Sequence, residues 1–124
     1  MAVDATFEIE ITPLEAILPT TSRFDFAKVW HGGAEGLSKG LMISGGDPAN
    51  GTAGYVAMEV FEGVLDGRKG TIAFQQFGTI VGGSQELRYE VVPGSGSGQL
   101  EDLSGVLHLE IDAAGVHHVE FELR

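Results

Sequence analysis

The segment between Gly54 and Gly78 constrains the fold of this chain more than any other. Two apolar runs, Tyr55–Leu65 and Thr71–Phe77, flank the sequence Asp66-Gly67-Arg68-Lys69-Gly70. An Asp-Gly pair between apolar runs is a strong signal for a tight β-hairpin turn, because both residue types tolerate the positive φ that such turns need. The segment therefore predicts two antiparallel strands in the middle of the chain.

Alternation of apolar and polar residues with a period of two predicts further strands on either side of this hairpin. They are expected at Val3–Thr12, Thr21–His31, Leu37–Ser44, Ser84–Val92, Val106–Asp112 and Val116–Leu123. Pro13 is expected to end the first strand, and Leu14–Pro19 to form a short connector with one helical turn. The segments 45–51 and 93–98 are rich in glycine and are predicted as a loop and as a bulged connection at the rim of a barrel.

About eight short consecutive strands predict an all-β fold, a closed antiparallel barrel formed by residues 1–124 as a single domain, because closure removes the free sheet edges. The 19 glycines among 124 residues fit the turns and bulges of such a fold. A barrel of this size is either filled by its own side chains or just wide enough to hold one small ligand.

The formal net charge of −11 argues against nucleic acid and against an anionic membrane surface as partners, because both are negatively charged. The N-terminus lacks the pattern of a signal peptide and no apolar run is long enough to span a membrane, so a cytoplasmic protein is expected. The chain has no cysteine, which excludes disulfides and zinc–sulfur sites. His117 and His118 must face opposite ways on a strand, so they cannot bind one metal ion together. Neither a metal nor a cofactor is expected.

Glu59 is the most informative polar residue, because it lies among apolar neighbours in the strand Tyr55–Leu65. Period two places it on one face with Tyr55 and Phe61, while the more apolar set of Val56, Met58 and Val60 takes the other face. Hydrophobicity alone would turn Glu59 outward. The room left by Ala57 and the mixed face of Tyr, Glu and Phe favour an inward Glu59 in a cavity lined by few polar groups.

An inward Glu59 predicts an interior site for a small apolar molecule. Glu59 and Gln76 are the candidate catalytic residues. The candidate ligand contacts are the aromatic and polar residues on the faces expected to point inward: Trp30, Phe24, Phe26, Lys28, Tyr55, Phe61, Phe74 and Tyr89. The outward apolar set would then need cover, which predicts a homodimer. In a competing interpretation, Glu59 braces the strands through Lys28 or Arg88 and performs no chemistry.

The central hairpin also resembles the core of a bacterial family, domain of unknown function 3224. That core runs Glu, then EGTLDGR, then Gly, and this chain carries Glu59 followed by Glu62-Gly63-Val64-Leu65-Asp66-Gly67-Arg68-Lys69-Gly70. The segment Val91-Val92-Pro93-Gly94-Ser95-Gly96-Ser97-Gly98-Gln99-Leu100 is similar to the second signature of the family, and Ser104-Gly105 to its small-residue turn. The opening Ala5-Thr6-Phe7-Glu8 is also similar, so the resemblance covers nearly the whole chain.

This resemblance implies an antiparallel barrel like that of allene oxide cyclase, in lipocalin-like style, and no established activity. The related cyclases enclose an apolar pocket with a few polar groups, one of them a glutamate. Glu59 stands at the recurring glutamate of the family. Gln76 stands where many members carry a histidine, which argues against a mechanism that needs a base there.

Three functions remain open on the sequence. The first is a barrel that binds a small, mainly apolar molecule in its interior. The second is an isomerase or cyclase that uses Glu59 as a general acid or base. The third is a structural or interaction barrel with a filled interior.

Overall fold

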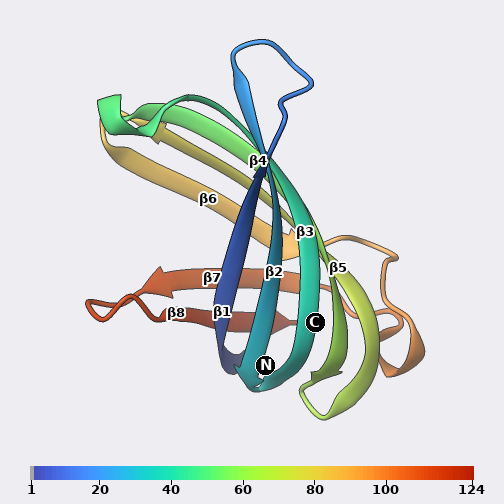
Figure 1. The fold of residues 1–124 in the computed structure, drawn as a ribbon. Coiled ribbons are helices and arrows are strands. Elements are labelled where there is room, and N and C mark those ends of the chain that lie inside the picture. The colour runs from blue at the N-terminus through green and yellow to red at the C-terminus, as the bar shows by residue number, and fades with distance from the viewer. Residues whose placement is uncertain (1) are drawn as a thin grey trace.

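Eight antiparallel strands follow one another within residues 2–124, the part of the chain that the computed structural model describes. Each strand pairs with the next in sequence, and β8 returns to β1, so the sheet closes into a barrel (Figure 1). The strands are β1 (Ala2–Leu14), β2 (Thr21–Gly32), β3 (Ala34–Asp47), β4 (Thr52–Leu65), β5 (Arg68–Val81), β6 (Ser84–Val91), β7 (Gly105–Ile111) and β8 (His117–Leu123). The closed antiparallel all-β barrel predicted from the sequence is confirmed.

The central hairpin forms as predicted, with a turn of only two residues. Asp66 and Gly67 both have positive φ, 53° and 75°, as hairpin turns of this length require. Leu65 and Arg68 are already paired across the turn, so β5 begins three residues before the predicted Thr71.

Two local predictions about the connections are wrong. Pro13 does not end β1, which continues to Leu14. Beyond Phe7, β1 pairs with β2 but no longer with β8, and a strand with one free edge tolerates proline. The helical turn expected within Leu14–Pro19 does not form; residues 17 and 18 make a bend and residues 19 and 20 a turn.

The loop predicted for residues 45–51 is shorter than expected. β3 runs through Gly45 and Gly46 to Asp47, and the short 3₁₀ helix η1 (Pro48–Asn50) follows. The Asp47 side chain accepts a hydrogen bond from the backbone N–H of Ala49 and so caps this helix.

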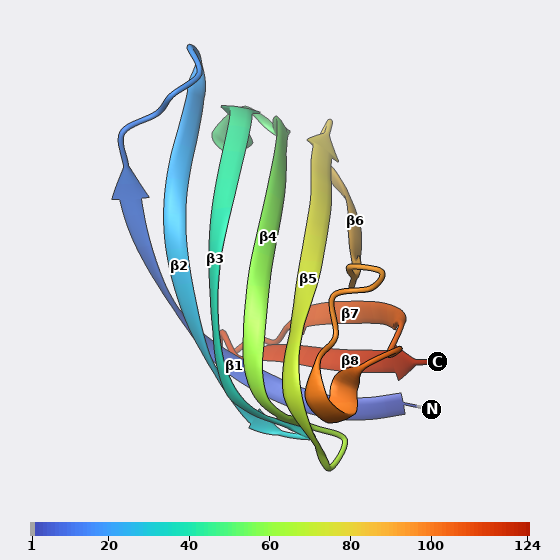
Figure 2. The ribbon, with the colours of Figure 1, turned by 90° about the vertical axis from the view of Figure 1, so that its right-hand side faces the viewer.

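The two ends of the barrel differ because β6 and β7 separate. Within the described residues they share a single register pair, Glu90 with Val106, whereas β2 to β5 stay paired over most of their length. Figure 2 shows the upper parts of β2 to β5 side by side, with β7 and β8 running across at the height of the lower parts of these strands. The end near the turn at Asp66 is called the closed end, and the end near η1 the open end.

The glycine-rich segment 93–98 completes the wall of the closed end. Ser97 donates its backbone N–H to the carbonyl of Thr71, and the Ser95 hydroxyl accepts from the backbone N–H of Ala73. The second 3₁₀ helix, η2 (Gly98–Leu100), follows and buries Leu100 completely. The segment therefore forms a connection at the barrel rim, as predicted, and takes the place that β6 leaves beside β5.

Aromatic side chains fill the interior of the closed end. Trp30 packs edge-on against Phe61 and Phe74, with ring centroids 6.2 Å apart in both pairs, and its ring lies 5.6 Å from that of Phe121. These four side chains are almost fully buried. The closed half is therefore a packed core.

Small residues on the inner face of β3 make this packing possible. Leu37 and Leu41, which carry much of the apolar character of that strand, are exposed, whereas Ser38 is buried and Gly40 lies against β2. A Cβ at Gly40 would approach the ring of Phe26 to 2.2 Å.

No helix within residues 2–124 is both long and apolar enough to cross a membrane.

Candidate ligand cavity and its polar floor

Glu59 points into the barrel and is buried, as one of the two sequence interpretations predicted. Its Oε1 accepts from Lys28 Nζ at 2.8 Å and from the Tyr89 hydroxyl at 2.6 Å. Lys28 Nζ also donates to the Tyr89 oxygen at 3.0 Å. The three side chains come from β2, β4 and β6, so this cluster ties together strands that are not neighbours in the barrel.

Ser38 connects the cluster to the aromatic core. Its hydroxyl donates to Glu59 Oε2 at 2.6 Å and accepts from the indole N–H of Trp30 at 3.0 Å. Buried polar groups are costly unless they are hydrogen-bonded. Ser38 therefore provides a hydrogen-bond partner both for the buried carboxylate of Glu59 and for the buried indole N–H of Trp30. The cluster of Lys28, Ser38, Glu59 and Tyr89 is called the polar floor below.

The ammonium group of Lys28 lies among aromatic rings. Its Nζ is 4.2 Å from the ring centroid of Phe7 and 5.2 to 5.5 Å from those of Tyr89, Phe26 and Trp30, distances at which a cation is attracted to a ring face. Burial lowers the pKa of Lys28, and the charge and hydrogen bond of Glu59 oppose this effect. Burial, followed by the charge of Glu59, raises the pKa of Tyr89 well above its ordinary value.

A cavity of about 140 Å³ lies next to the polar floor inside the barrel. Lys28 contributes to its wall, and Glu59 does not. The remaining lining is mostly apolar: Phe7, Ile9, Ile11, Phe26, Met42, Tyr55, Ala57, Gln76, Leu109, Ile111 and His117. This space is called the inner cavity.

A wider hollow of about 810 Å³ lies toward the open end. It shares Met42, Tyr55, Leu109 and Ile111 with the inner cavity, so the two spaces adjoin. Its wall includes Leu87 of β6 and residues of β7. These are the two strands that separate at this end of the barrel. This hollow is called the mouth, and it exists because the upper parts of β6 and β7 do not pair.

Tyr55 and Gln76 form a second polar pair at the boundary between the mouth and the inner cavity. The Tyr55 hydroxyl donates to Gln76 Oε1 at 2.8 Å, and burial raises the pKa of Tyr55. Gly78 makes room for this tyrosine, since a Cβ there would lie 2.3 Å from its ring. The hydrogen bond orients the amide of Gln76 and leaves its N–H groups for another acceptor.

The structure separates the residues that the sequence grouped as one site. Gln76, Phe26, Lys28 and Tyr55 line the inner cavity, and Phe24 lines the mouth. Glu59 and Tyr89 belong to the polar floor. Trp30, Phe61 and Phe74 lie in the packed core of the closed half. Arg88, the other cation considered as a partner of Glu59, instead lies near Glu90, with Arg88 Nη2 3.5 Å from Glu90 Oε2.

Sequence reasoning missed Ser38 and the aliphatic part of the lining. Ser38 alternates with Gly36 and Gly40 along β3, and a small-residue face opposite a face of Leu and Ile gives no signal of an interior position. Ile9, Ile11 and Leu109 could have been found, because each lies on the apolar face of an alternating strand. His117 stacks on Phe7 with ring centroids 4.7 Å apart, inside the barrel, whereas His118 contacts Asp112 on the outside.

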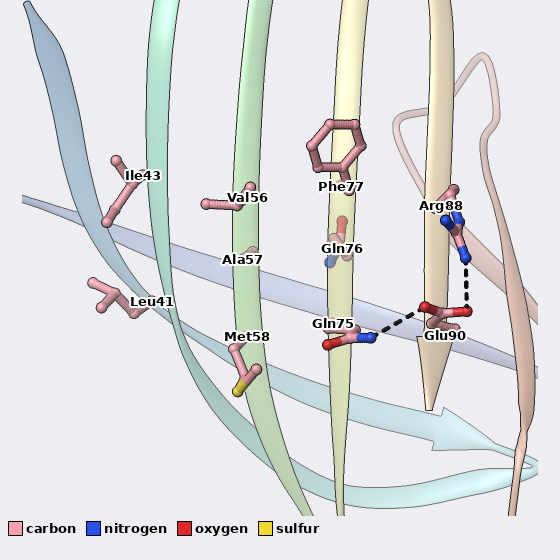
Figure 3. Close-up of a pocket in the computed structure, with 10 residues that line it drawn as sticks. All are labelled: Leu41, Ile43, Val56, Ala57, Met58, Gln75, Gln76, Phe77, Arg88 and Glu90. Atoms are coloured by element: carbon pink, nitrogen blue, oxygen red, sulfur yellow. Dashed lines mark hydrogen bonds and ion pairs between the residues drawn. The ribbon is translucent and has the colours of Figure 1, made fainter. Parts of the chain in front are cut away.

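Another hollow, of about 480 Å³, lies on the outer face of the sheet. Its lining includes Ala57 and Gln76, which also line the inner cavity on the other side of the sheet. Figure 3 shows most of its side chains in two rows that cross β3 to β6, with Ala57 and Gln76 between the rows. One row holds Ile43, Val56, Phe77 and Arg88, and the other holds Leu41, Met58, Gln75 and Glu90. This surface is called the outer face.

Comparisons with known proteins agree with this architecture. The family described as "Protein of unknown function (DUF3224)" matches residues 3–123. A crystal structure of a protein with unknown function from the same family, from Shewanella oneidensis MR-1, superimposes with a TM-score of 0.93 at 35% identity. The match covers 100% of this chain and 96% of that one. No protein with a curated functional description matches the chain. The chain therefore belongs to the DUF3224 family of β-barrel proteins.

Proposed function

We propose that this protein binds a small, mainly apolar molecule in the inner cavity, which the molecule enters through the mouth. The observation that carries the proposal is the contrast between the two halves of the barrel. Aromatic side chains fill the closed half, whereas the open half encloses a largely apolar space next to Lys28 and Gln76. Binding sites for small molecules typically combine apolar walls with a few polar groups that orient the ligand.

The size of the space sets the scale of the ligand. An apolar cavity of roughly 150 Å³ can hold a benzene-sized group, and the inner cavity has about 140 Å³. The adjoining mouth offers room for the rest of a longer molecule. The proposed ligand therefore places one end or one ring beside Lys28 and extends along Met42 and Leu109.

The two other functions draw less support from the geometry. Lys28, Tyr89 and Ser38 occupy both oxygens of Glu59, which suits a brace better than a group that exchanges protons with a substrate. An isomerase or cyclase would need a ligand to displace one of these partners. A purely structural barrel would need no open space beside its buried charges.

Trp30 provides a direct test of binding. It is the only tryptophan in the chain, and its indole contacts the polar floor through Ser38. We expect a panel of apolar molecules to change its emission saturably, with calorimetry as an independent measurement. If no molecule in a broad panel gives a signal by either method, the proposed function is wrong.

A pair of matched variants locates the site. Ala57 lines the inner cavity, so Ala57→Leu should fill part of it and weaken binding at least about tenfold, a cost of about 1.4 kcal/mol. Ala27 is exposed on β2, and Ala27→Leu should leave binding unchanged. Equal affinities in the two variants would place the ligand elsewhere.

A further inference from the structure

The inner cavity presents hydrogen-bond donors at its polar end. The ammonium of Lys28 has three N–H groups. Two of them are accounted for by Glu59 Oε1 and the Tyr89 oxygen, and the third has no oxygen partner within residues 2–124. Lys28 itself forms part of the cavity wall.

Gln76 adds donors to the same wall. Its Oε1 already accepts from the Tyr55 hydroxyl, and its amide nitrogen makes no hydrogen bond to the described part of the chain. Gln76 is half-buried, and its amide nitrogen is not enclosed by protein atoms. The residue lines the inner cavity and also the hollow on the outer face. The Tyr55 proton is used in the bond to Gln76. The N–H groups of Gln76 and Lys28 are therefore available to a ligand at this end of the cavity, and the other polar side chain of the lining, His117, stacks on Phe7.

The charge of the cavity is balanced. Glu59 neutralises Lys28 at 2.8 Å, and the rest of the lining is uncharged apart from His117 when that ring is protonated. The mouth carries Glu86 and Glu110, and the whole chain has a net charge of −11. Inside the inner cavity, an anionic group would meet no permanently charged side chain that lacks a counter-ion. A cationic group there would meet the N–H donors of Lys28 and Gln76 and no free carboxylate.

We infer that the ligand carries a neutral hydrogen-bond acceptor of the carbonyl type, such as a ketone, ester or amide oxygen, at the end of an apolar body. The oxygen accepts from Lys28 Nζ and from the Gln76 amide, and the apolar body extends past Met42 and Leu109 toward the mouth. This inference rests on the proposed function and adds the chemical class of the ligand to it.

The test compares ligands of equal length in the unmodified protein. The probes are a medium-chain methyl ketone, the alkane, the carboxylate and the primary amine of the same chain length, each titrated by calorimetry and by Trp30 emission. Two new hydrogen bonds are worth about tenfold in affinity or more. We expect the ketone to bind at least about tenfold more tightly than the other three.

Each outcome separates the inference from the proposed function. Equal binding of ketone and alkane would overturn the inference and leave an apolar binding site. Tighter binding of the carboxylate or the amine would overturn it by showing a charged ligand class. Failure of all four probes, together with a broad apolar panel, would overturn the proposed function as well.

A second comparison assigns the effect to Gln76. Gln76→Leu replaces the amide with an apolar side chain of similar size. The variant should therefore show a smaller preference for ketone over alkane, and its affinity for the alkane should be nearly unchanged. Gln75→Leu is the matched control, because Gln75 lies on the outer face and donates to Glu90. The ligand series in the unmodified protein decides the question if Gln76→Leu does not fold. A ketone preference that survives in a folded Gln76→Leu variant would remove Gln76 from the inference.

Discussion

Lys28 Nζ lies 2.8 Å from Glu59 Oε1 inside the barrel, where the two side chains are only 2% and 1% exposed. A buried ion pair adds little net stability, since the loss of hydration offsets most of the attraction. Removal of one partner is costly, however, because the other charge stays buried without compensation.

Glu59→Gln should destabilise the protein strongly. The substitution leaves Lys28 without its counter-ion, and broken buried pairs typically cost about 3–5 kcal/mol. Urea unfolding of both proteins measures the difference. Glu62→Gln, at an exposed position of the same strand, is the control and should change stability little. A Glu59→Gln variant as stable as this control would contradict the brace and favour a functional carboxylate. Lys28→Met added to Glu59→Gln should recover part of the lost stability.

Tyr89→Phe should change how stability depends on alkaline pH. Burial and the charge of Glu59 raise the pKa of Tyr89 in the folded protein above its ordinary value of 10.0. The folded state then binds the phenolic proton more tightly than the unfolded state does. The contribution of Tyr89 is therefore fully present below pH 10 and is lost as the pH rises above it.

The corresponding measurement is the difference in melting temperature between the two proteins from neutral pH to above pH 10. Tyr89→Phe should be less stable at neutral pH, since Glu59 and Lys28 lose a partner, and the gap should narrow above pH 10. Lys28 titrates in both proteins, so its lowered pKa does not produce the narrowing. A gap that stays constant or widens would refute this account of Tyr89.

Ser38→Ala should destabilise the protein and alter Trp30. The indole N–H and Glu59 Oε2 both lose their partner, and each buried unsatisfied group costs about 1–3 kcal/mol. Chemical unfolding and the emission spectrum of Trp30 are the measurements. Ser22→Ala, at an exposed position of β2, is the control. Equal stability and identical spectra for the two variants would exclude the connection through Ser38.

The homodimer predicted from the sequence remains a proposal, and the outer face supplies its test. Val56, Met58 and Phe77 are 47%, 51% and 58% exposed there, and Val60, next along the same side of β4, is 55% exposed. Exposed apolar patches commonly mark interaction sites. We expect sedimentation to show a species of about twice 13.1 kDa, and Val56→Asp to shift it to the monomer. Ile17→Asp, in the exposed connector between β1 and β2, should not. A monomer at high concentration of the unmodified protein would refute the dimer.

The strands and the central turn could be predicted because their signals are local. Alternation along β2 places Phe24, Phe26, Lys28 and Trp30 on one face, and the structure keeps all four on the inner side. The strand ends were less predictable, as Pro13 shows. Whether a proline ends a strand depends on the strands beside it, and β1 loses its pairing with β8 beyond Phe7 while it keeps that with β2.

The site was predictable only in part. Period two put Glu59 on a face with Tyr55 and Phe61, but it could not show that Tyr89 and Ser38 would meet the carboxylate. Those contacts join residues 30 and 21 positions apart in the chain. The split of the aromatic residues between a packed core and an open cavity follows from the separation of β6 and β7, for which the sequence of neither strand gives a signal.

By itself, the sequence determined the class of fold, the order of the strands and the hairpin at Asp66-Gly67, because alternation and turn chemistry act between neighbouring residues. Only the tertiary structure decided which face of β4 is inside. The more apolar set of Val56, Met58 and Val60 lies on the outer face, and Glu59 lies within. A buried carboxylate is tolerated when charge and hydrogen bonds compensate its lost hydration. That compensation comes from Lys28, Ser38 and Tyr89, which meet Glu59 only after the barrel has closed.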